Sequence, residues 1–152
     1  MPGGQLAVNG NSLRVRGIAP PYHAYRAAGR WGARRRRVWQ GNEDYWRGLA
    51  ADVLPHVCAP ALIVGDFNVQ FPPRGYPSAN SAAFRSCEAA LNGWQVATAG
   101  LPVDGRPLDK PLVCHLAHTP DLDVVNCSVL SRFDDDGLEL SDHPCICLTL
   151  RL

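Results

Sequence analysis

The chain has 152 residues, 46% of them apolar and 19% charged, a composition typical of one globular domain with a single core. No apolar run approaches the ~18 residues of a membrane-spanning helix, and the first residues show no basic region followed by an apolar stretch. We therefore expect no transmembrane segment and no signal peptide, and we favour an intracellular location.

The net charge of +1 is unevenly distributed along the chain. Residues 1–50 contain nine arginines against two acidic residues, a net +7, whereas residues 51–152 contain six basic and twelve acidic residues, a net −6. The basic half favours a polyanionic partner, although an arginine-rich coding bias would give the same pattern. The six cysteines form no CxxC pair and suit either buried free thiols or, in a secreted protein, disulfides.

The first half of the chain predicts a β-hairpin and a helix. Residues 5–18 contain an Asn-Gly turn signal, followed by apolar residues alternating with arginine. Residues 22–41 combine aromatic side chains with six arginines and indicate a loop that leads into a helix. Apolar spacing of three and four residues predicts that helix over residues 42–54, with Asn42 as its N-cap and Pro55 at its end.

The second half predicts three strands and a second helix. Residues 61–64 are a continuous apolar run, typical of a strand buried on both faces. The second helix is expected to begin after Ser78 as N-cap and to end at Gly93. Two strands, 122–128 and 144–152, follow a Pro- and Gly-rich loop and are separated by an acidic turn. This order predicts a mixed α/β domain of layered helices and sheets.

Two short polar motifs lie at the ends of predicted strands. Gly-Asp-Phe-Asn at 65–68 follows one strand, Ser-Asp-His at 141–143 precedes another, and Asp123 opens a third. Metal-assisted phosphoryl transfer uses these side-chain types as hard oxygen ligands, as a base for water and as donors to developing charge. Each motif alone also suits a turn or a structural histidine, and Asp121 is a rival to Asp123. Their order along the chain favours a site.

In that order, the motifs resemble the endonuclease/exonuclease/phosphatase superfamily, which has the DNase I-like fold. The matching segments are 62–68, 122–128 and 140–150, and the hairpin 6–18 with the helix 42–54 is similar to the middle of the family's domain. The resemblance implies a four-layer α/β sandwich. It also implies Mg²⁺-dependent hydrolysis, with Mn²⁺ as an alternative ion, of a phosphodiester or phosphomonoester, with DNA or RNA favoured as substrate.

The resemblance also implies a role for each matching polar residue. Asp66 would orient or deprotonate the attacking water, and Asn68 would help to hold that water and the phosphate. His143 would contact a phosphate oxygen, and Asp123 would accept a hydrogen bond from its imidazole and fix its tautomer. Asp142 would face the metal. The five residues would together form the phosphate-handling part of the site.

The chain departs from the family at its beginning. The family's first strands carry an Asn and then a Glu, which is the principal metal ligand, whereas this chain starts at the hairpin that follows them. Glu43, Glu88 and Glu139 lie on predicted helices or loops, where they cannot replace that ligand. We therefore expect residues 1–152 to be the C-terminal half of the fold, truncated and without its N-terminal strands, as a fragment, a mis-started gene product or a degenerate copy, and to be incomplete as a catalyst.

The arginine- and tryptophan-rich segment leaves a second interpretation open. Arg34–Arg37, with Trp31 and Trp39 beside them, are suited to contact phosphates and to stack on bases. A non-catalytic remnant that binds nucleic acid is therefore the alternative function, and a solvated loop is the simplest explanation of the segment. Tyr22 and His23 are candidates for a further site residue that the family often has in its middle segment.

Overall fold

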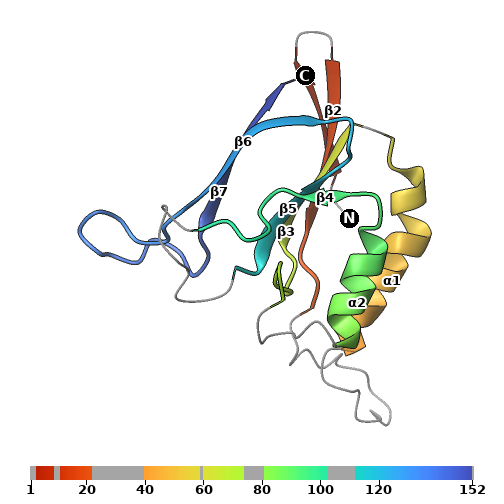
Figure 1. The fold of residues 1–152 in the computed structure, drawn as a ribbon, viewed down its shortest axis with the longest axis horizontal. Coiled ribbons are helices and arrows are strands. Elements are labelled where there is room, and N and C mark those ends of the chain that lie inside the picture. Colours follow the sequence, from red (N-terminus) through yellow and green to blue (C-terminus); the bar gives the residue numbers. More distant parts are fainter. Residues whose placement is uncertain are drawn as a thin grey trace.

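Five strands form one sheet and two strands form another. The structure is a computed structural model that describes residues 3–8, 11–21, 40–58, 60–73, 81–102 and 112–151. The first sheet has the strand order β1-β2-β3-β5-β4, and the second pairs β6 with β7 (Figure 1). The elements are β1 (Gly3–Val8), β2 (Asn11–Ile18), α1 (Gln40–Asp52), a 3₁₀ turn (Leu54–His56), β3 (Ala61–Asp66), α2 (Ala82–Ala90), β4 (Gln95–Val96), β5 (Cys114–His118), β6 (Asp123–Leu130) and β7 (Cys145–Arg151).

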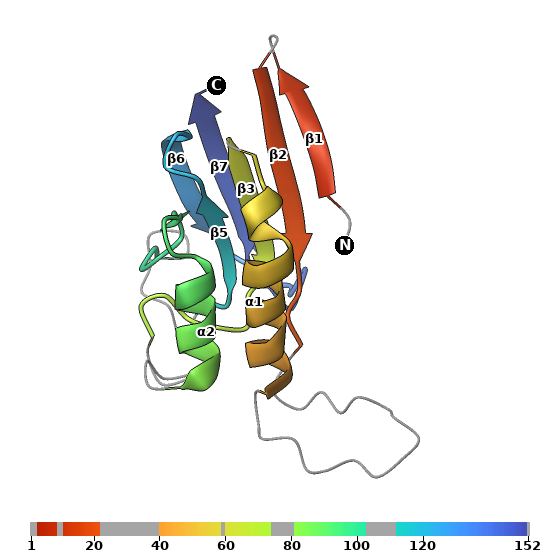
Figure 2. The ribbon, with the colours of Figure 1, turned by 90° about the vertical axis from the view of Figure 1, so that its right-hand side faces the viewer.

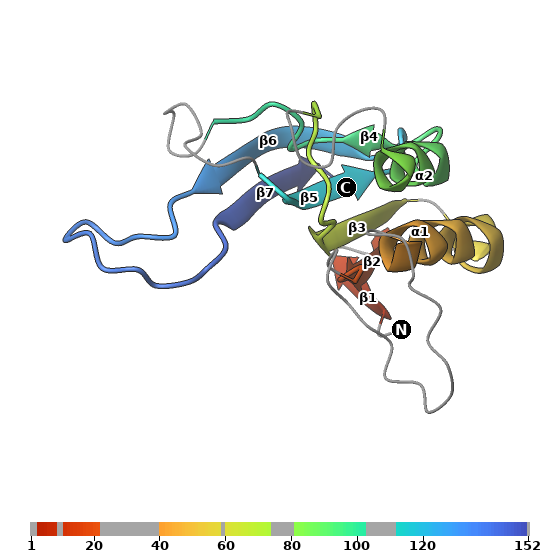
Figure 3. The ribbon, with the colours of Figure 1, turned by 90° about the horizontal axis from the view of Figure 1, so that it is seen from below.

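The central strand β3 is buried on both faces, as its apolar run predicts. Ile63 belongs to the core that the two helices cover, together with Trp46 of α1 and Phe84 of α2. Leu62 belongs to a second core, against which apolar side chains of β7 pack. The five-stranded sheet therefore lies between a layer of helices and the β6–β7 pair (Figures 2 and 3).

The predicted hairpin and first helix are confirmed, but the predicted N-cap is wrong. β1 and β2 pair antiparallel, and the turn that joins them lies outside the described residues. Helix α1 begins at Gln40, so Asn42 lies inside its first turn and is buried. The Asn42 side-chain amide donates to the carbonyl oxygens of Pro21 (3.5 Å) and Phe67 (3.4 Å), which ties the helix to the segments that follow β2 and β3. The helix ends at Asp52, just before the 3₁₀ turn that contains Pro55.

The second helix begins later than predicted. Its N-cap is Ser81, whose hydroxyl accepts a hydrogen bond from the Phe84 N–H, and not Ser78, which lies outside the described residues. The sequence predicts an apolar stripe along this helix, and the structure confirms it, because its four members are buried: Ala83, Phe84, Cys87 and Leu91. Gly93 has a left-handed φ of 83° in the turn after the helix, two residues past the C-cap Leu91.

Strand β5, which lies between β3 and β4 in the sheet, was not predicted from the sequence. Four consecutive side chains of β5 are buried, and two of them are histidines: His115, Leu116, Ala117 and His118. Because the two imidazoles interrupt the apolar residues, the segment shows neither the alternating nor the continuous apolar pattern by which strands are recognised. The sequence therefore did not predict a strand here. The short strand β4 pairs with β5 and was also missed.

The last two strands form the second sheet, and in β7 half-buried residues alternate with exposed ones, as apolar residues at every second position of the sequence predict. Ile146, Leu148 and Leu150 are half-buried against the five-stranded sheet. The acidic turn between the strands is confirmed, because Asp134 Oδ1 accepts hydrogen bonds from the N–H groups of Asp136 and Leu138. Among the helices of the described segments, none is both long enough and apolar enough to cross a membrane.

All six cysteines are free thiols in the structure. Cys87 is buried in the helix-side core, where burial raises its pKa, as expected for a structural thiol. Cys58, Cys145 and Cys147 are exposed, so the prediction of buried thiols is wrong for these three. Cys114 and Cys127 are partly buried.

Candidate functional site

Strand pairing places Asp66 beside Cys114. The two residues are direct partners in the antiparallel register of β3 and β5. Cross-strand partners point to the same face of a sheet, with Cβ atoms about 4.5–5.5 Å apart. Because side chains alternate along a strand, Asp66 shares its face with Leu62 and Val64, which pack toward β7. The Asp66 carboxylate and the Cys114 thiol therefore lie at the end of the β7-facing side of the sheet.

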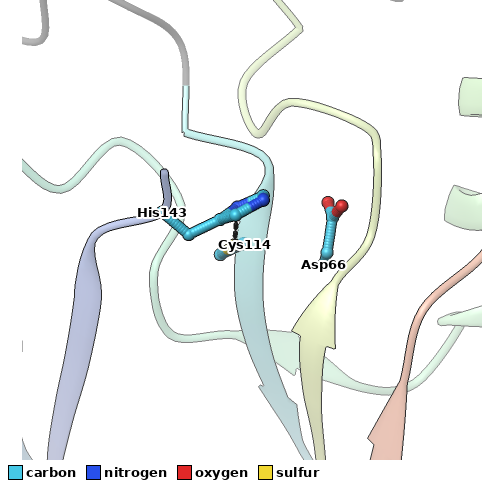
Figure 4. A group of neighbouring side chains, drawn as sticks. All are labelled: Asp66, Cys114 and His143. Carbon is cyan, nitrogen blue, oxygen red and sulfur yellow. Dashed lines mark hydrogen bonds between the residues drawn. The ribbon is translucent and has the colours of Figure 1, made fainter. Parts of the chain in front are cut away.

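The second sheet brings His143 to the same place. His143 comes two residues before β7, whose inward side chains pack on the face that carries Leu62 and Leu116. The His143 Nδ1 and the Cys114 Sγ lie 2.9 Å apart in a hydrogen bond. Figure 4 shows the imidazole and the thiol side by side, with the Asp66 carboxylate rising from the end of β3 beside them.

One ligand atom from each of Asp66, Cys114 and His143 lies within 4.8 Å of the other two. The atoms are a carboxylate oxygen, a thiol sulfur and an imidazole nitrogen. This group of three side chains could hold a metal ion. Two of its members, Asp66 and His143, are residues that the sequence predicts for the site, and the structure brings them together from different sheets.

The chain around Asp66 has a local geometry that only certain residues permit. Gly65 has a φ of 141°, and a Cβ on it would lie 2.0 Å from the carbonyl oxygen of Ile18 in β2. Asp66 Oδ1 accepts a hydrogen bond from the Asn68 N–H (2.9 Å), which closes a turn typical of aspartate. Asn68 itself has a left-handed φ of 53°, which asparagine tolerates better than most residues.

The side chain of Asn68 is buried and contacts backbone. Its amide nitrogen donates to the carbonyl oxygen of Pro20 (2.9 Å), in the segment that follows β2. This bond fixes the turn that carries Asp66 against the end of β2. In this structure Asn68 therefore orients the carboxylate of Asp66, and its amide N–H₂ points to backbone.

The electrostatic environment of the group is negative. Burial raises the pKa of Cys114 to about 12, and the carboxylates of Asp66 and Asp142 add to the effect. The thiol is therefore protonated at neutral pH. Asp142 is 89% exposed, and its Oδ2 lies 3.7 Å from His143 Nε2. Two carboxylates near one thiol create a field that attracts cations.

His115 points to the opposite face of β5 and is structural. Its Nε2 faces the carbonyl oxygens of Val69 (2.9 Å) and Leu112 (3.1 Å), so this nitrogen carries the proton. Nδ1 then accepts from the Thr98 hydroxyl, 2.9 Å away. Burial lowers the pKa of His115 to about 4 in spite of its bonds to the two carbonyls. The neutral imidazole thus fastens β5, and with it Cys114, to the chain that follows Asp66.

Asp123 does not lie where the resemblance implies. It pairs in register with Arg151 at the far end of β7, and its Oδ2 lies 3.0 Å from the Arg151 guanidinium. His143 lies two residues beyond the other end of β7, whose seven residues span six steps, or roughly 20 Å. The predicted hydrogen bond between Asp123 and His143 is therefore wrong, because the antiparallel pairing of β6 with β7 sends the two residues to opposite ends of the hairpin.

The other acidic residues considered from the sequence lie elsewhere. Glu43 is buried in α1 with its Oε2 3.4 Å from Arg47, and Glu139 forms a 2.9 Å ion pair with Arg132 between the last two strands. Glu88 is exposed on α2. The predictions that concern Tyr22, His23 and Arg34–Arg37 fall outside the described residues.

Cys114 is the site residue that was not predicted from the sequence. The miss follows directly from the missed strand β5, since a cysteine in an expected loop has no fixed neighbours. Residues 112–117, bounded by Pro111 and Pro120, are apolar except for His115, and they gave only a weak signal for a short strand. Comparison of the chain with models of known protein families, and with curated proteins, finds no match. The superfamily resemblance stays a prediction that depends on the motifs.

Proposed function

We propose that this chain carries a phosphoester-hydrolysing site built on Asp66 and His143. The observation that supports it is the meeting of these two side chains, from separate sheets, within 4.8 Å. The residues belong to the Gly-Asp-Phe-Asn and Ser-Asp-His motifs, which the sequence associates with phosphate chemistry. A base and a hydrogen-bond donor at such a distance are the minimum that hydrolysis by water requires.

The two groups would act on one water and one phosphate. A separation below 4.8 Å lets a single water hydrogen-bond to both the carboxylate and the imidazole. The Asp66 carboxylate takes a proton from that water as its oxygen bonds to phosphorus. The His143 imidazole donates to a phosphoryl oxygen, where negative charge increases, and the ester oxygen leaves with a proton from solvent.

The Mg²⁺ ion that the resemblance implies does not fit the three converging donors. Mg²⁺ requires near-octahedral oxygen ligands at about 2.0–2.1 Å. The group here offers one carboxylate oxygen together with a thiol sulfur and an imidazole nitrogen. We therefore assign Mg²⁺ no part in the action of Asp66 and His143.

The fold class and the substrate class belong to the same proposal. We propose that the order of layers, helices then five-stranded sheet then two-stranded sheet, corresponds to part of a DNase I-like sandwich. The basic residues Arg34–Arg37 support a nucleic-acid phosphodiester as the substrate.

Hydrolysis by variant chains tests the proposal. We expect the full chain to cleave bis-p-nitrophenyl phosphate or a DNA oligonucleotide. Asp66→Asn and His143→Ala should each lower the rate by at least ~100-fold, the usual contribution of a positioned acid or base. Asp123→Asn is the matched control, because this exposed carboxylate lies at the far end of the hairpin and should leave the rate unchanged. Equal losses in Asp66→Asn and Asp123→Asn, or no turnover at all, would contradict the proposal.

A further inference from the structure

We propose that Asp66, Cys114 and His143 form a three-ligand site for Zn²⁺. The inference deepens the proposed function, on which it rests for the use of the ion. The binding itself depends only on the three side chains. Their ligand atoms come from β3, from β5 and from the segment before β7, and they converge within 4.8 Å (Figure 4).

The donor set selects the class of metal. Zinc accepts Cys sulfur, His nitrogen and Asp oxygen, and its catalytic sites use three protein ligands with a fourth position left open. Thiolate and imidazole ligands disfavour Mg²⁺ and Ca²⁺, which take oxygen. An Asp–Cys–His group therefore matches zinc better than the ion that the two sequence motifs imply.

The present spacing needs only a small adjustment to admit the ion. Ideal bonds of about 2.3 Å to sulfur and 2.05 Å to nitrogen, at a tetrahedral angle, place these two atoms about 3.6 Å apart. In the structure the Cys114 Sγ and the His143 Nδ1 lie 2.9 Å apart, because they share a proton in a hydrogen bond. A side-chain rotation that opens this pair by about 0.7 Å is available to His143, whose side chain is 40% exposed.

The charge balance also favours a cation. As Zn²⁺ binds, a Zn–S bond replaces the S–H bond of Cys114, and the released proton passes to solvent. The positive charge of the ion is complementary to the carboxylate of Asp66 in the group and to that of Asp142 beside His143. The same carboxylates argue against Cys114 as an unassisted nucleophile, because reactive cysteines lie in electropositive surroundings.

The bound ion would explain why the Cys114 thiol lies beside one residue from each of the two phosphate-handling motifs. Zinc with an open position lowers the pKa of a bound water to near 7 and so supplies hydroxide at neutral pH. His143, through Nδ1, and Asp66, through one oxygen, would then hold the ion, which leaves the His143 Nε2–H for the phosphoryl oxygen and the second Asp66 oxygen for the water. The consequence is a zinc-dependent rather than magnesium-dependent hydrolysis.

Cobalt substitution tests the site without reference to activity. The full chain, prepared with chelator and then freed of it, is titrated with Co²⁺ and with Zn²⁺. We expect one equivalent of Co²⁺ to bind and to produce a thiolate-to-cobalt charge-transfer band in the near ultraviolet. Zn²⁺ should displace the Co²⁺ and remove the band, whereas millimolar Mg²⁺ should not. Cys114→Ser, nearly isosteric, should abolish the band. His143→Ala removes a ligand at a partly exposed position and should weaken Co²⁺ binding. The loss should exceed the ~10–100-fold that is typical when a residue hydrogen-bonded to a metal ligand is removed.

The exposed cysteines of β7 provide the control. The double variant Cys145→Ser, Cys147→Ser removes two surface thiols and should keep the band unchanged. The inference would be overturned if the band persists in Cys114→Ser, if it disappears in the double variant, or if Mg²⁺ removes it. It would also be overturned if the unmodified chain binds no stoichiometric Co²⁺. Zinc binding without hydrolysis would leave this inference standing and reject the proposed function. Hydrolysis unaffected by Cys114→Ser and by chelator would reject the inference alone.

Discussion

The glycine that precedes Asp66 should be the most sensitive glycine of the described sheet. At Gly65, an alanine Cβ would lie 2.0 Å from the Ile18 carbonyl oxygen. Ordinary van der Waals contact begins at 3.4 Å, so β2 and β3 would have to separate by about 1.4 Å. Such a shift breaks backbone hydrogen bonds of the β2–β3 pair. The φ of 141° adds strain of about 1–3 kcal/mol, and overpacking adds a similar amount. We expect Gly65→Ala to lower the free energy of unfolding by about 4 kcal/mol, a large part of a typical total.

Two other glycines separate the causes of this loss. Gly137 has a φ of 81°, but a Cβ added to it would meet no atom within 4 Å, so Gly137→Ala should cost only about 1–2 kcal/mol. Gly48 lies inside α1 with ordinary φ and open space, so Gly48→Ala should stabilise by up to about 1 kcal/mol. Urea unfolding followed by circular dichroism measures all three. A Gly65→Ala loss no larger than that of Gly137→Ala would refute the argument from close approach of the strands.

Two further predictions concern residues that support the site. Histidine has a pKa near 6.5 in an unfolded chain, and burial lowers the pKa of His115 to about 4. Because the unfolded chain therefore binds this proton more readily, acid favours unfolding. The free energy of unfolding should fall by about 2 kcal/mol between pH 7 and pH 5 on account of this group. Urea unfolding at both pH values should show a correspondingly smaller fall in His115→Gln, and an equal fall would count against a buried neutral imidazole. Asn68→Ala loses a buried hydrogen bond to Pro20 and also places alanine at a φ of 53°, whereas Asn68→Gly loses only the bond. Asn68→Ala should therefore be less stable than Asn68→Gly by about 1 kcal/mol in the same assay, and the reverse order would show that the left-handed φ carries no strain.

Local sequence patterns predict the elements whose buried side chains are apolar and regularly spaced. The alternation of Ile146, Leu148 and Leu150 and the apolar run 61–64 each identify a strand and its buried face, and the structure agrees. Helix boundaries were less predictable, because the cap depends on tertiary contacts. Asn42 has the residue type of an N-cap, but its amide is used by the carbonyls of Pro21 and Phe67.

The positions of the site residues depend on pairing between strands, which local patterns do not encode. Asp66 and His143 were predicted because their motifs end and precede recognisable strands. Asp123 was assigned to the same site because it opens a strand, but strand direction decides the outcome. In the antiparallel β6–β7 pair, the first residue of β6 lies beside the last residue of β7, so Asp123 meets Arg151.

The strand that local patterns hid is the one that determines the chemistry of the site. β5 has no clear apolar pattern because His115, satisfied by Thr98 and two backbone carbonyls, occupies a core position. The same imidazole ties β5 to Val69 in the chain after β3, and the backbone register of β3 with β5 sets Cys114 opposite Asp66. A sulfur ligand in place of an oxygen changes the preferred ion from magnesium to zinc. The zinc preference that we propose for this site would therefore follow from tertiary pairing, because neither short motif contains Cys114.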